Sequence, residues 1–314
     1  MRCVILDDYQ GVALAMADWS ALDLAVTANR EHVTDPDELV GLLAGVEVVV
    51  VMRERTPLPR AVLERLPALR LVVTSGMRNA SIDLAACADL GITVSGTASS
   101  STPPVELTWA LLLGLARSLP HELGELRRGG PWQSTLGADL AGATLGLVGL
   151  GKIGTRVAAV GSAFGMDVVA WSPHLTEDRA GAGGARLVER GQLFAGSDFV
   201  SLHLVLSDST RGIVGAQELA AMRPSAYLVN TSRAGLVDTP ALLDALDRGA
   251  IAGAGLDVFD QEPLPADDRL RVHPRVLATP HLGYVTRGNY ATYFTEAVED
   301  IAAWRAGAPV RVLV

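Results

Sequence analysis

Three residues in the second half of the chain have side chains suited to acid–base chemistry and to carboxylate binding. His281 lies in "LATPHLGYV" (277–285), and histidine can gain or lose a proton near neutral pH. Arg233 follows an apolar run in "LVNTSRAGLVD", where a guanidinium can grip a carboxylate through two parallel N–H bonds. Glu262 follows another apolar run in "AGLDVFDQEPLP". The alternatives are a histidine that fills a loop, an arginine that caps a turn and an exposed loop acid.

A glycine motif precedes these residues. "VGLGKIG" places Gly149, Gly151 and Gly154 in the G-x-G-x-x-G pattern, between the apolar run "TLGLV" and the helical run "TRVAAVGSAFG". In such a strand–turn–helix the first glycine permits the tight turn, the second lets a pyrophosphate approach, and the third lets the helix pack closely. The N–H groups of the helix N-terminus would hold the phosphate charge. The alternative is a glycine-rich turn with no ligand.

Strands and helices alternate along the chain, which predicts an α/β fold with parallel sheets. Strands are predicted at 2–8, 46–52, 69–76 and 91–96 and, after the glycine motif, at 167–172, 198–204, 226–232, 252–258 and 275–280. Helices are predicted at 57–67, at 105–119, which is apolar around most of its circumference, and at 287–307, before the strand-like 309–314. The Ser/Thr/Pro-rich stretch "TASSSTPPVE" is a candidate domain boundary.

Length and composition restrict the class of protein. A chain of 314 residues with 49% hydrophobic and 19% charged residues is globular and long enough for two domains. A net charge of -9 without a basic run argues against nucleic acid as a partner. Cys3 and Cys87 form neither a disulfide framework nor a metal site, and no apolar stretch approaches the roughly 18 to 20 residues of a membrane span. We therefore expect a cytoplasmic protein without a metal and without membrane contact.

Taken together, these segments resemble the D-isomer-specific 2-hydroxyacid dehydrogenases nearly from end to end. The resemblance rests on "VGLGKIG", "NTSRAGLVD", "AGAGLDVFDQEPLP" and "TPHLGYVT" in that order, together with "SGMRNASIDLAACADLGITV" and "VELTWALLLGLAR". It implies two Rossmann-like or flavodoxin-like domains with a cleft between them. Residues 1–101 with 285–314 would form the substrate domain, and residues 102–284 the dinucleotide-binding domain.

The resemblance also implies the roles of individual residues. Arg233, Glu262 and His281 would be the catalytic set, in which His281 moves the proton, Glu262 fixes its tautomer and favours its protonated form, and Arg233 holds the substrate carboxylate. Asp257 would hold the nicotinamide carboxamide. The remaining cofactor-binding residues would be Gly149, Gly151, Lys152, Ile153, Gly154, Ser172, Thr210 and Thr231. The loop that binds the substrate carboxylate would consist of Ser75, Gly76, Met77, Arg78 and Asn79.

Three positions depart from the usual pattern of the family. Arg78 stands where a second loop glycine is common, and if it points toward the substrate it favours a second acidic or strongly polar group. Val205 replaces a proline after His203. Ser172 replaces the acid that normally binds the adenosine ribose and repels a 2′-phosphate, with His174 and Arg179 as nearby cations. We therefore expect NAD, with NADP also possible.

The predicted function is an oxidoreductase that transfers a hydride between a nicotinamide cofactor and a small 2-hydroxy or 2-keto acid of D configuration. The alternative is a dinucleotide-sensing binding protein or corepressor without a metabolic turnover role. The absence of long extra tails for partner docking favours the enzyme. Because the helix at 105–119 is too apolar to face water, and because this helix lies at the dimer contact in relatives, we also expect a homodimer.

Overall fold

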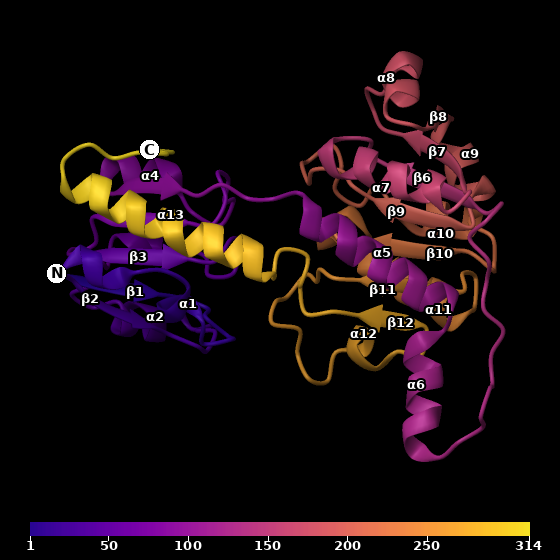
Figure 1. The fold of residues 1–314 in the computed structure, drawn as a ribbon, viewed down its shortest axis with the longest axis horizontal. Helices are drawn as coiled ribbons and strands as arrows, with labels where there is room; N and C mark the ends of the chain where they lie inside the picture. Colours follow the sequence, from indigo (N-terminus) through magenta and orange to yellow (C-terminus); the bar gives the residue numbers. More distant parts are fainter. The chain divides into compact units, whose positions relative to one another are not determined.

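A computed structural model describes all residues, 1–314, and confirms the predicted α/β fold with two parallel sheets (Figure 1). The chain divides into two compact units, the first formed by 1–100 together with 285–314 and the second by 101–284. No helix is both long and apolar enough to span a membrane.

The first unit contains one five-stranded sheet in the order β2-β1-β3-β4-β5, with all strands parallel. Its strands are β1 (Arg2–Ile5), β2 (Ala25–Ala28), β3 (Val48–Val51), β4 (Leu71–Thr74) and β5 (Thr93–Gly96). Its helices are α1 (Ala13–Met16), α2 (Pro36–Leu42), α3 (Arg60–Leu63), α4 (Leu84–Asp89) and α13 (Arg287–Arg305), with a 3-10 turn η1 (Trp19–Leu22). Every residue of β3 and β4 is buried, as expected of central strands covered on both faces.

Two predictions for this unit were inaccurate. The helix expected over 57–67 is the single turn α3, because prolines at both ends of the segment oppose a longer helix. The strand expected over 309–314 is only an isolated antiparallel bridge between Ser95 and Val312, extended by the hydrogen bond from Leu313 N to Val94 O at 2.7 Å. These contacts attach the C-terminus to the outer edge of β5.

The second unit contains a seven-stranded parallel sheet in the order β12-β11-β10-β9-β6-β7-β8. Its strands are β6 (Thr144–Val148), β7 (Asp167–Trp171), β8 (Arg186–Leu187), β9 (Phe199–Leu202), β10 (Tyr227–Asn230), β11 (Gly253–Leu256) and β12 (Val276–Ala278). Its helices are α5 (Thr102–Ala116), α6 (Leu119–Arg128), α7 (Lys152–Ala163), α8 (Glu177–Ala182), α9 (Arg190–Gly196), α10 (Ala216–Ala221), α11 (Thr239–Asp247) and α12 (Arg269–Val272), with a 3-10 turn η2 (Ala234–Leu236). The strand order reverses on either side of β6, the place where such sheets bind dinucleotides.

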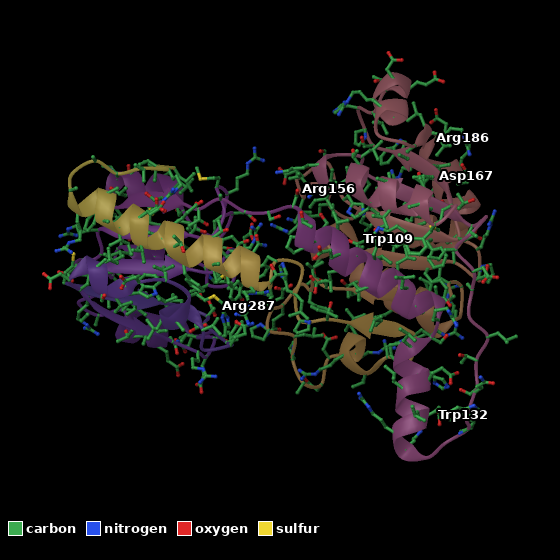
Figure 2. The ribbon with its side chains drawn as sticks, viewed as in Figure 1. Trp109, Trp132, Arg156, Asp167, Arg186 and Arg287 are labelled. Atoms are coloured by element: carbon green, nitrogen blue, oxygen red, sulfur yellow. The ribbon has the colours of Figure 1, made fainter.

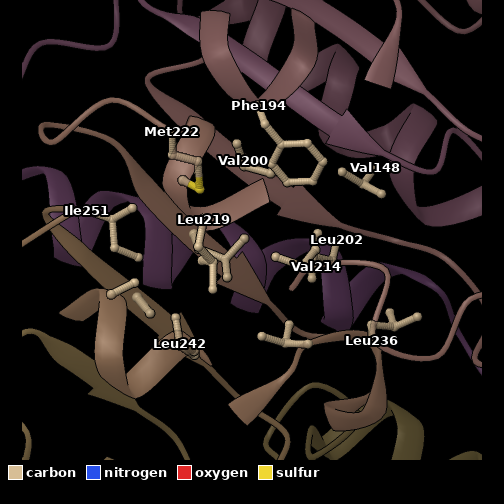
Figure 3. Close-up of a cluster of buried hydrophobic side chains, with 14 of the residues drawn as sticks. Val148, Phe194, Val200, Leu202, Val214, Leu219, Met222, Leu236, Leu242 and Ile251 are labelled. Atoms are coloured by element: carbon tan, nitrogen blue, oxygen red, sulfur yellow. The ribbon is translucent and has the colours of Figure 1, made fainter. Parts of the chain in front are cut away.

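Both faces of this sheet are covered. One face packs a cluster that includes Phe194, Val200 and Leu242 beneath α9 to α11 (Figure 3). On the other face α5 packs on α7, β10 and β11, and its Trp109 (labelled in Figure 2) packs against Phe164 with ring centroids 5.1 Å apart and the ring planes tilted by 32°. The apolar surface of α5 is therefore buried inside its own unit. The argument that this helix must be covered by a second copy was wrong.

The exposed apolar surface of this unit lies on the next element instead. The helix expected over 105–119 ends at Ala116, and a separate helix, α6, follows it and leads into an arm (129–139) (Figure 1). Leu126, Trp132 and Leu136 are 59%, 81% and 99% exposed there, and Figure 2 shows Trp132 at the outer end of this arm. Glu122 Oε1 accepts hydrogen bonds from the backbone and hydroxyl groups of 134–135, which hold the arm to the helix.

Candidate active site

His281 and Glu262 are in direct contact. His281 Nδ1 lies 2.7 Å from Glu262 Oε2, and the other carboxylate oxygen, Oε1, accepts a hydrogen bond from Phe259 N at 2.9 Å. The two side chains are 16% and 19% exposed, so both are largely shielded from water but not completely buried. Because Nδ1 faces Glu262, Nε2 is the ring nitrogen on the opposite side, where it can serve a substrate.

Asp257 holds the loop that carries His281. Its Oδ1 accepts hydrogen bonds from the Thr279 hydroxyl at 2.6 Å and from Leu282 N at 2.7 Å, and its Oδ2 accepts one from Gly283 N at 2.8 Å. Burial raises the pKa of Asp257, although these donors oppose the rise. The carboxyl group is completely buried. Its three hydrogen-bond donors within the chain belong to the loop around His281, whose φ of 51° needs such support.

The loop after β10 positions Arg233. The side chain of Asn230, which is 1% exposed, donates to Arg233 O at 2.9 Å and accepts from Ser232 N at 3.0 Å. Arg233 thus follows β10, Asp257 follows the adjacent β11, and His281 follows β12, which is next in the sheet. Three neighbouring parallel strands deliver the guanidinium, the loop anchor and the imidazole to the same sheet edge.

The glycine motif forms a strand–turn–helix between β6 and α7. Gly149 has φ +103°, and a Cβ there would lie 2.8 Å from the His203 carbonyl, while a Cβ on Gly154 would overlap the Gly149 carbonyl oxygen. Both glycines are therefore required by the fold itself. A Cβ on Gly151 would meet no atom within 4 Å, so nothing within the chain demands a glycine at this position. The space beside Gly151 lies at the start of α7, next to Lys152 and Ile153.

The loops on either side of this motif contain the other predicted cofactor residues. Ser172 follows β7 and is half-buried, and Arg179 Nη1 donates to His174 O at 3.0 Å, which brings a guanidinium to the same loop. After β9, the Thr210 hydroxyl donates to the carbonyl of the exposed Val205 at 2.7 Å and accepts from Ser207 N at 2.8 Å. Thr210 therefore shapes its loop.

His203, at the start of the same loop, is neutral. Burial lowers its pKa to about 4, and its Nε2 lies 2.9 Å from the hydroxyl of Ser201. It therefore adds no positive charge beside the glycine turn.

The predicted substrate loop belongs to the first unit and follows β4. Ser75 N donates to Val51 O at 3.1 Å and Gly76 N to the Thr97 hydroxyl at 3.0 Å, so both of these N–H groups are used within the unit. Met77 and Arg78 are exposed, and the Asn79 side chain donates to Arg53 O at 2.5 Å. The backbone N–H groups of 77–79 donate no hydrogen bond within the chain.

Sequence reasoning missed Arg53, which lies beside this loop. Its backbone N donates to the Ser75 hydroxyl at 2.9 Å, and a Cβ on Gly76 would lie 3.0 Å from its Nη1. A φ of +50° at Arg53 is rare for a residue other than glycine and marks a constrained turn at the end of β3. The only sequence signal was its place directly after a Val-rich strand.

Comparisons with known proteins agree with this geometry. A family model described as "D-isomer specific 2-hydroxyacid dehydrogenase, NAD binding domain" matches residues 109–283. The chain is 37% identical to the D-3-phosphoglycerate dehydrogenase of Methanocaldococcus jannaschii, covering 84% of this chain and 51% of that protein. It is also 37% identical to the (S)-sulfolactate dehydrogenase of Chromohalobacter salexigens, covering 91% and 93%. A crystal structure of a phosphoglycerate oxidoreductase from Vibrio cholerae superimposes with a TM-score of 0.93 at 38% identity, covering 98% and 100%.

These relatives differ in how much of their own length the chain covers. The chain spans about half the length of the first three D-3-phosphoglycerate dehydrogenases that it matches. It spans nearly the whole of the sulfolactate dehydrogenase.

Proposed function

Since the chain belongs to the D-isomer specific 2-hydroxyacid dehydrogenase family, we propose that it is an NAD(P)-dependent oxidoreductase acting on the CH–OH group of a small D-2-hydroxy acid. The observation that carries this proposal is the His281–Glu262 contact, at the same sheet edge as Arg233. The bound nicotinamide would supply or accept the hydride at C2 of the substrate. The second unit would be the dinucleotide-binding domain and the first the substrate domain.

The chain's own residues would do the remaining work. His281 Nε2 would take the proton from the C2 hydroxyl during oxidation and return it during reduction, which is general acid–base catalysis. Glu262, locked by Phe259 N, would keep the other ring nitrogen protonated, so that Nε2 exchanges the proton. Arg233 would hold the α-carboxylate and align C2, together with the backbone N–H groups of 77–79.

The cofactor would be NAD, held at the glycine turn. Two features support tolerance of NADP as well. Ser172 carries no charge to repel a 2′-phosphate, and the guanidinium of Arg179 lies against the same loop.

The substrate would carry a second anionic or strongly polar group. Arg78 is exposed on the substrate loop, and the guanidinium of Arg53, which also lies 3.9 Å from Glu54 Oε2, is next to Gly76 of the same loop, so two arginines are available beside the N–H groups that would receive the carboxylate. Two relatives are named for 3-phosphoglycerate and sulfolactate, which are 2-hydroxy acids with a phosphate or sulfonate at C3.

Turnover measurements test this proposal. The purified chain should oxidise or reduce members of a panel of 2-hydroxy and 2-keto acids, some with and some without a second anionic group, and the nicotinamide absorbance should follow the reaction. His281→Ala should lower kcat by at least about a hundredfold. Cofactor binding without turnover of any panel member would instead favour the dinucleotide-sensing alternative. Arg78→Ala should reduce kcat/KM for substrates with the second anionic group more than for pyruvate, and an equal effect on both would refute the role of Arg78.

The assembly would be a homodimer formed through α6 and its arm. An ordered surface with highly exposed Leu126, Trp132 and Leu136 is apolar enough to need a partner, and a second copy would cover it. Leu126→Asp and Leu136→Asp should give monomers in sedimentation at micromolar concentration, whereas Leu14→Asp, which changes a 51% exposed leucine of the first unit, should not. A monomeric wild type would contradict this assembly.

The location would be the cytoplasm. Cys3 and Cys87 are both free and buried, which suits a reducing compartment. Fractionation of cells that express the tagged full chain would test this location.

A further inference from the structure

Few sulfur atoms of this protein are open to an oxidant. The chain has two cysteines and six methionines. Cys3 and Cys87 are completely buried, and burial raises the pKa of their thiols to about 12 and about 11, respectively. Because peroxides react with the thiolate and not with the thiol, neither cysteine offers a reactive sulfur. Oxidation of sulfur in this protein by peroxide is therefore directed to methionine.

The methionines differ in exposure and in place. Four of them are buried or half-buried: Met16, Met52, Met166 and Met222. The other two, Met1 and Met77, are 52% and 45% exposed. Met1 precedes β1 and Met77 follows β4, so the parallel strands place them at opposite edges of the five-stranded sheet. Met77 is thus the exposed thioether at the edge that carries the predicted substrate loop.

The surroundings of Met77 combine its sulfur with hydrogen-bond donors. A Cβ on Gly96 would lie 3.2 Å from Met77 Sδ and 2.7 Å from Gly76 O, so the thioether lies against the end of β5, beside the backbone of its own loop. The N–H groups of 77–79 donate no hydrogen bond within the chain. An oxidisable sulfur and donors with no acceptor in the chain therefore share one short loop.

Oxidation changes what this side chain can bind. A peroxide transfers one oxygen atom to the thioether: the O–O bond breaks, an S=O bond forms, sulfur gives up two electrons, and the rest of the peroxide takes up the proton and leaves as water. A thioether sulfur is a weak acceptor, whereas a sulfoxide is polar and its oxygen accepts hydrogen bonds. The unbranched side chain has three rotatable bonds, so this oxygen can turn to the N–H groups of its own loop.

We propose that Met77 is a site of reversible oxidation by peroxide, at which the sulfoxide oxygen competes with the substrate carboxylate for the N–H groups of 77–79. This inference rests on the proposed function, because it requires a carboxylate substrate at this loop. Competition of this kind raises KM and leaves kcat nearly unchanged, since neither Arg233 nor His281 is altered. A thiol-dependent methionine sulfoxide reductase returns the thioether and lowers KM again.

The test measures peptide mass and kinetics in the same sample. The purified chain is treated with hydrogen peroxide, the peroxide is removed, and peptides are analysed by mass spectrometry. The Met77 peptide should gain one oxygen atom before the peptides of the four buried or half-buried methionines. KM for the best keto acid should rise about five- to tenfold, the usual effect of one hydrogen bond, while kcat stays within about twofold. Incubation with both epimer-specific sulfoxide reductases should restore KM.

Three variants assign the effect to Met77, each compared with its own untreated sample. Met77→Leu keeps an apolar side chain of similar size without the sulfur, so its KM should not respond to peroxide. Met77→Gln carries an acceptor oxygen in place of the thioether, so its KM should be high before treatment and should not rise further. Met16→Leu removes the half-buried methionine of α1 and should respond like the wild type.

Three results would overturn this inference and leave the proposed function intact. The first is a Met77 peptide that gains oxygen no faster than the Met52 and Met166 peptides. The second is an unchanged KM when the Met77 peptide is fully oxidised. The third is an equal rise in KM in the wild type and in Met77→Leu. Absence of turnover by the untreated wild type with every keto acid would overturn the proposed function and this inference with it.

Discussion

Replacement of Glu262 by glutamine is the sharpest test of the acid–base pair. The change keeps the shape of the side chain but turns one of its two acceptor oxygens into an NH₂ donor. In the wild type both oxygens accept, one from Phe259 N at 2.9 Å and the other from the His281 Nδ1 side at 2.7 Å. Glutamine can satisfy only one of them.

The two orientations of the new amide have different consequences. If its oxygen stays with Phe259 N, the NH₂ faces Nδ1, which must then accept, and the proton of a neutral His281 moves to Nε2. Nε2 then has no lone pair to take a proton from the substrate. If the amide flips, His281 keeps the active tautomer, but the buried N–H of Phe259 faces another donor. An unsatisfied buried N–H costs about 1 to 3 kcal/mol, so only about one molecule in 5 to 150 should be in the active arrangement.

The measurement is kcat for oxidation of the best 2-hydroxy acid at alkaline pH. Under these conditions the reaction needs the Nε2 lone pair as proton acceptor, so loss of this lone pair has its largest effect on kcat. Glu262→Gln should lower this kcat by about 5- to 150-fold. Its profile for keto acid reduction should move to lower pH, since the protonated ring also needs an acceptor at Nδ1. Glu218→Gln, which changes another glutamate that accepts a backbone N–H bond in the same unit, should leave both measurements unchanged. Wild-type oxidation kinetics in Glu262→Gln at every pH would refute this account of the tautomer.

Two further predictions concern stability and cofactor choice. Burial raises the pKa of Asp300 to about 6 from 3.8, although Arg311 donates to its Oδ1 at 2.8 Å, so its contribution to stability is complete below about pH 4 and disappears as pH rises through 6. Between about pH 4 and 6, the free energy of unfolding of the wild type, measured by urea denaturation, should fall by at most about 3 kcal/mol relative to that of Asp300→Asn. If the unfolding free energies of the two proteins change in parallel with pH, the raised pKa of Asp300 is contradicted. The wild type should prefer NADH over NADPH by less than about a hundredfold, and Ser172→Asp should widen that preference in kcat/KM. A wild type that already rejects NADPH by well over about a thousandfold would show that another residue excludes it.

Much of the site was predictable because it depends on strand ends. Parallel strands place their carboxyl ends on one sheet edge, so any polar residue directly after such a strand is a candidate for the same site. Arg233 follows a run that reads as a strand, and His281 and Glu262 lie shortly after two others. The two strands that escaped prediction lack this signal, because β2 is half-exposed along its length and β8 has two residues.

The sequence alone determined the fold class and the glycine turn, because these depend on local periodicity and on residue chemistry, and it identified the candidate catalytic side chains through the resemblance of their motifs to those of the family. The tertiary structure alone decided what each side chain touches. Asp257 meets Thr279 across 22 residues of chain, and Thr108 meets Thr231 across 123. Such contacts depend on how helices pack on sheets and on single rotamers, which no local pattern encodes. The same physics buried the apolar surface of α5 within its own unit and left the apolar surface on α6 and its arm.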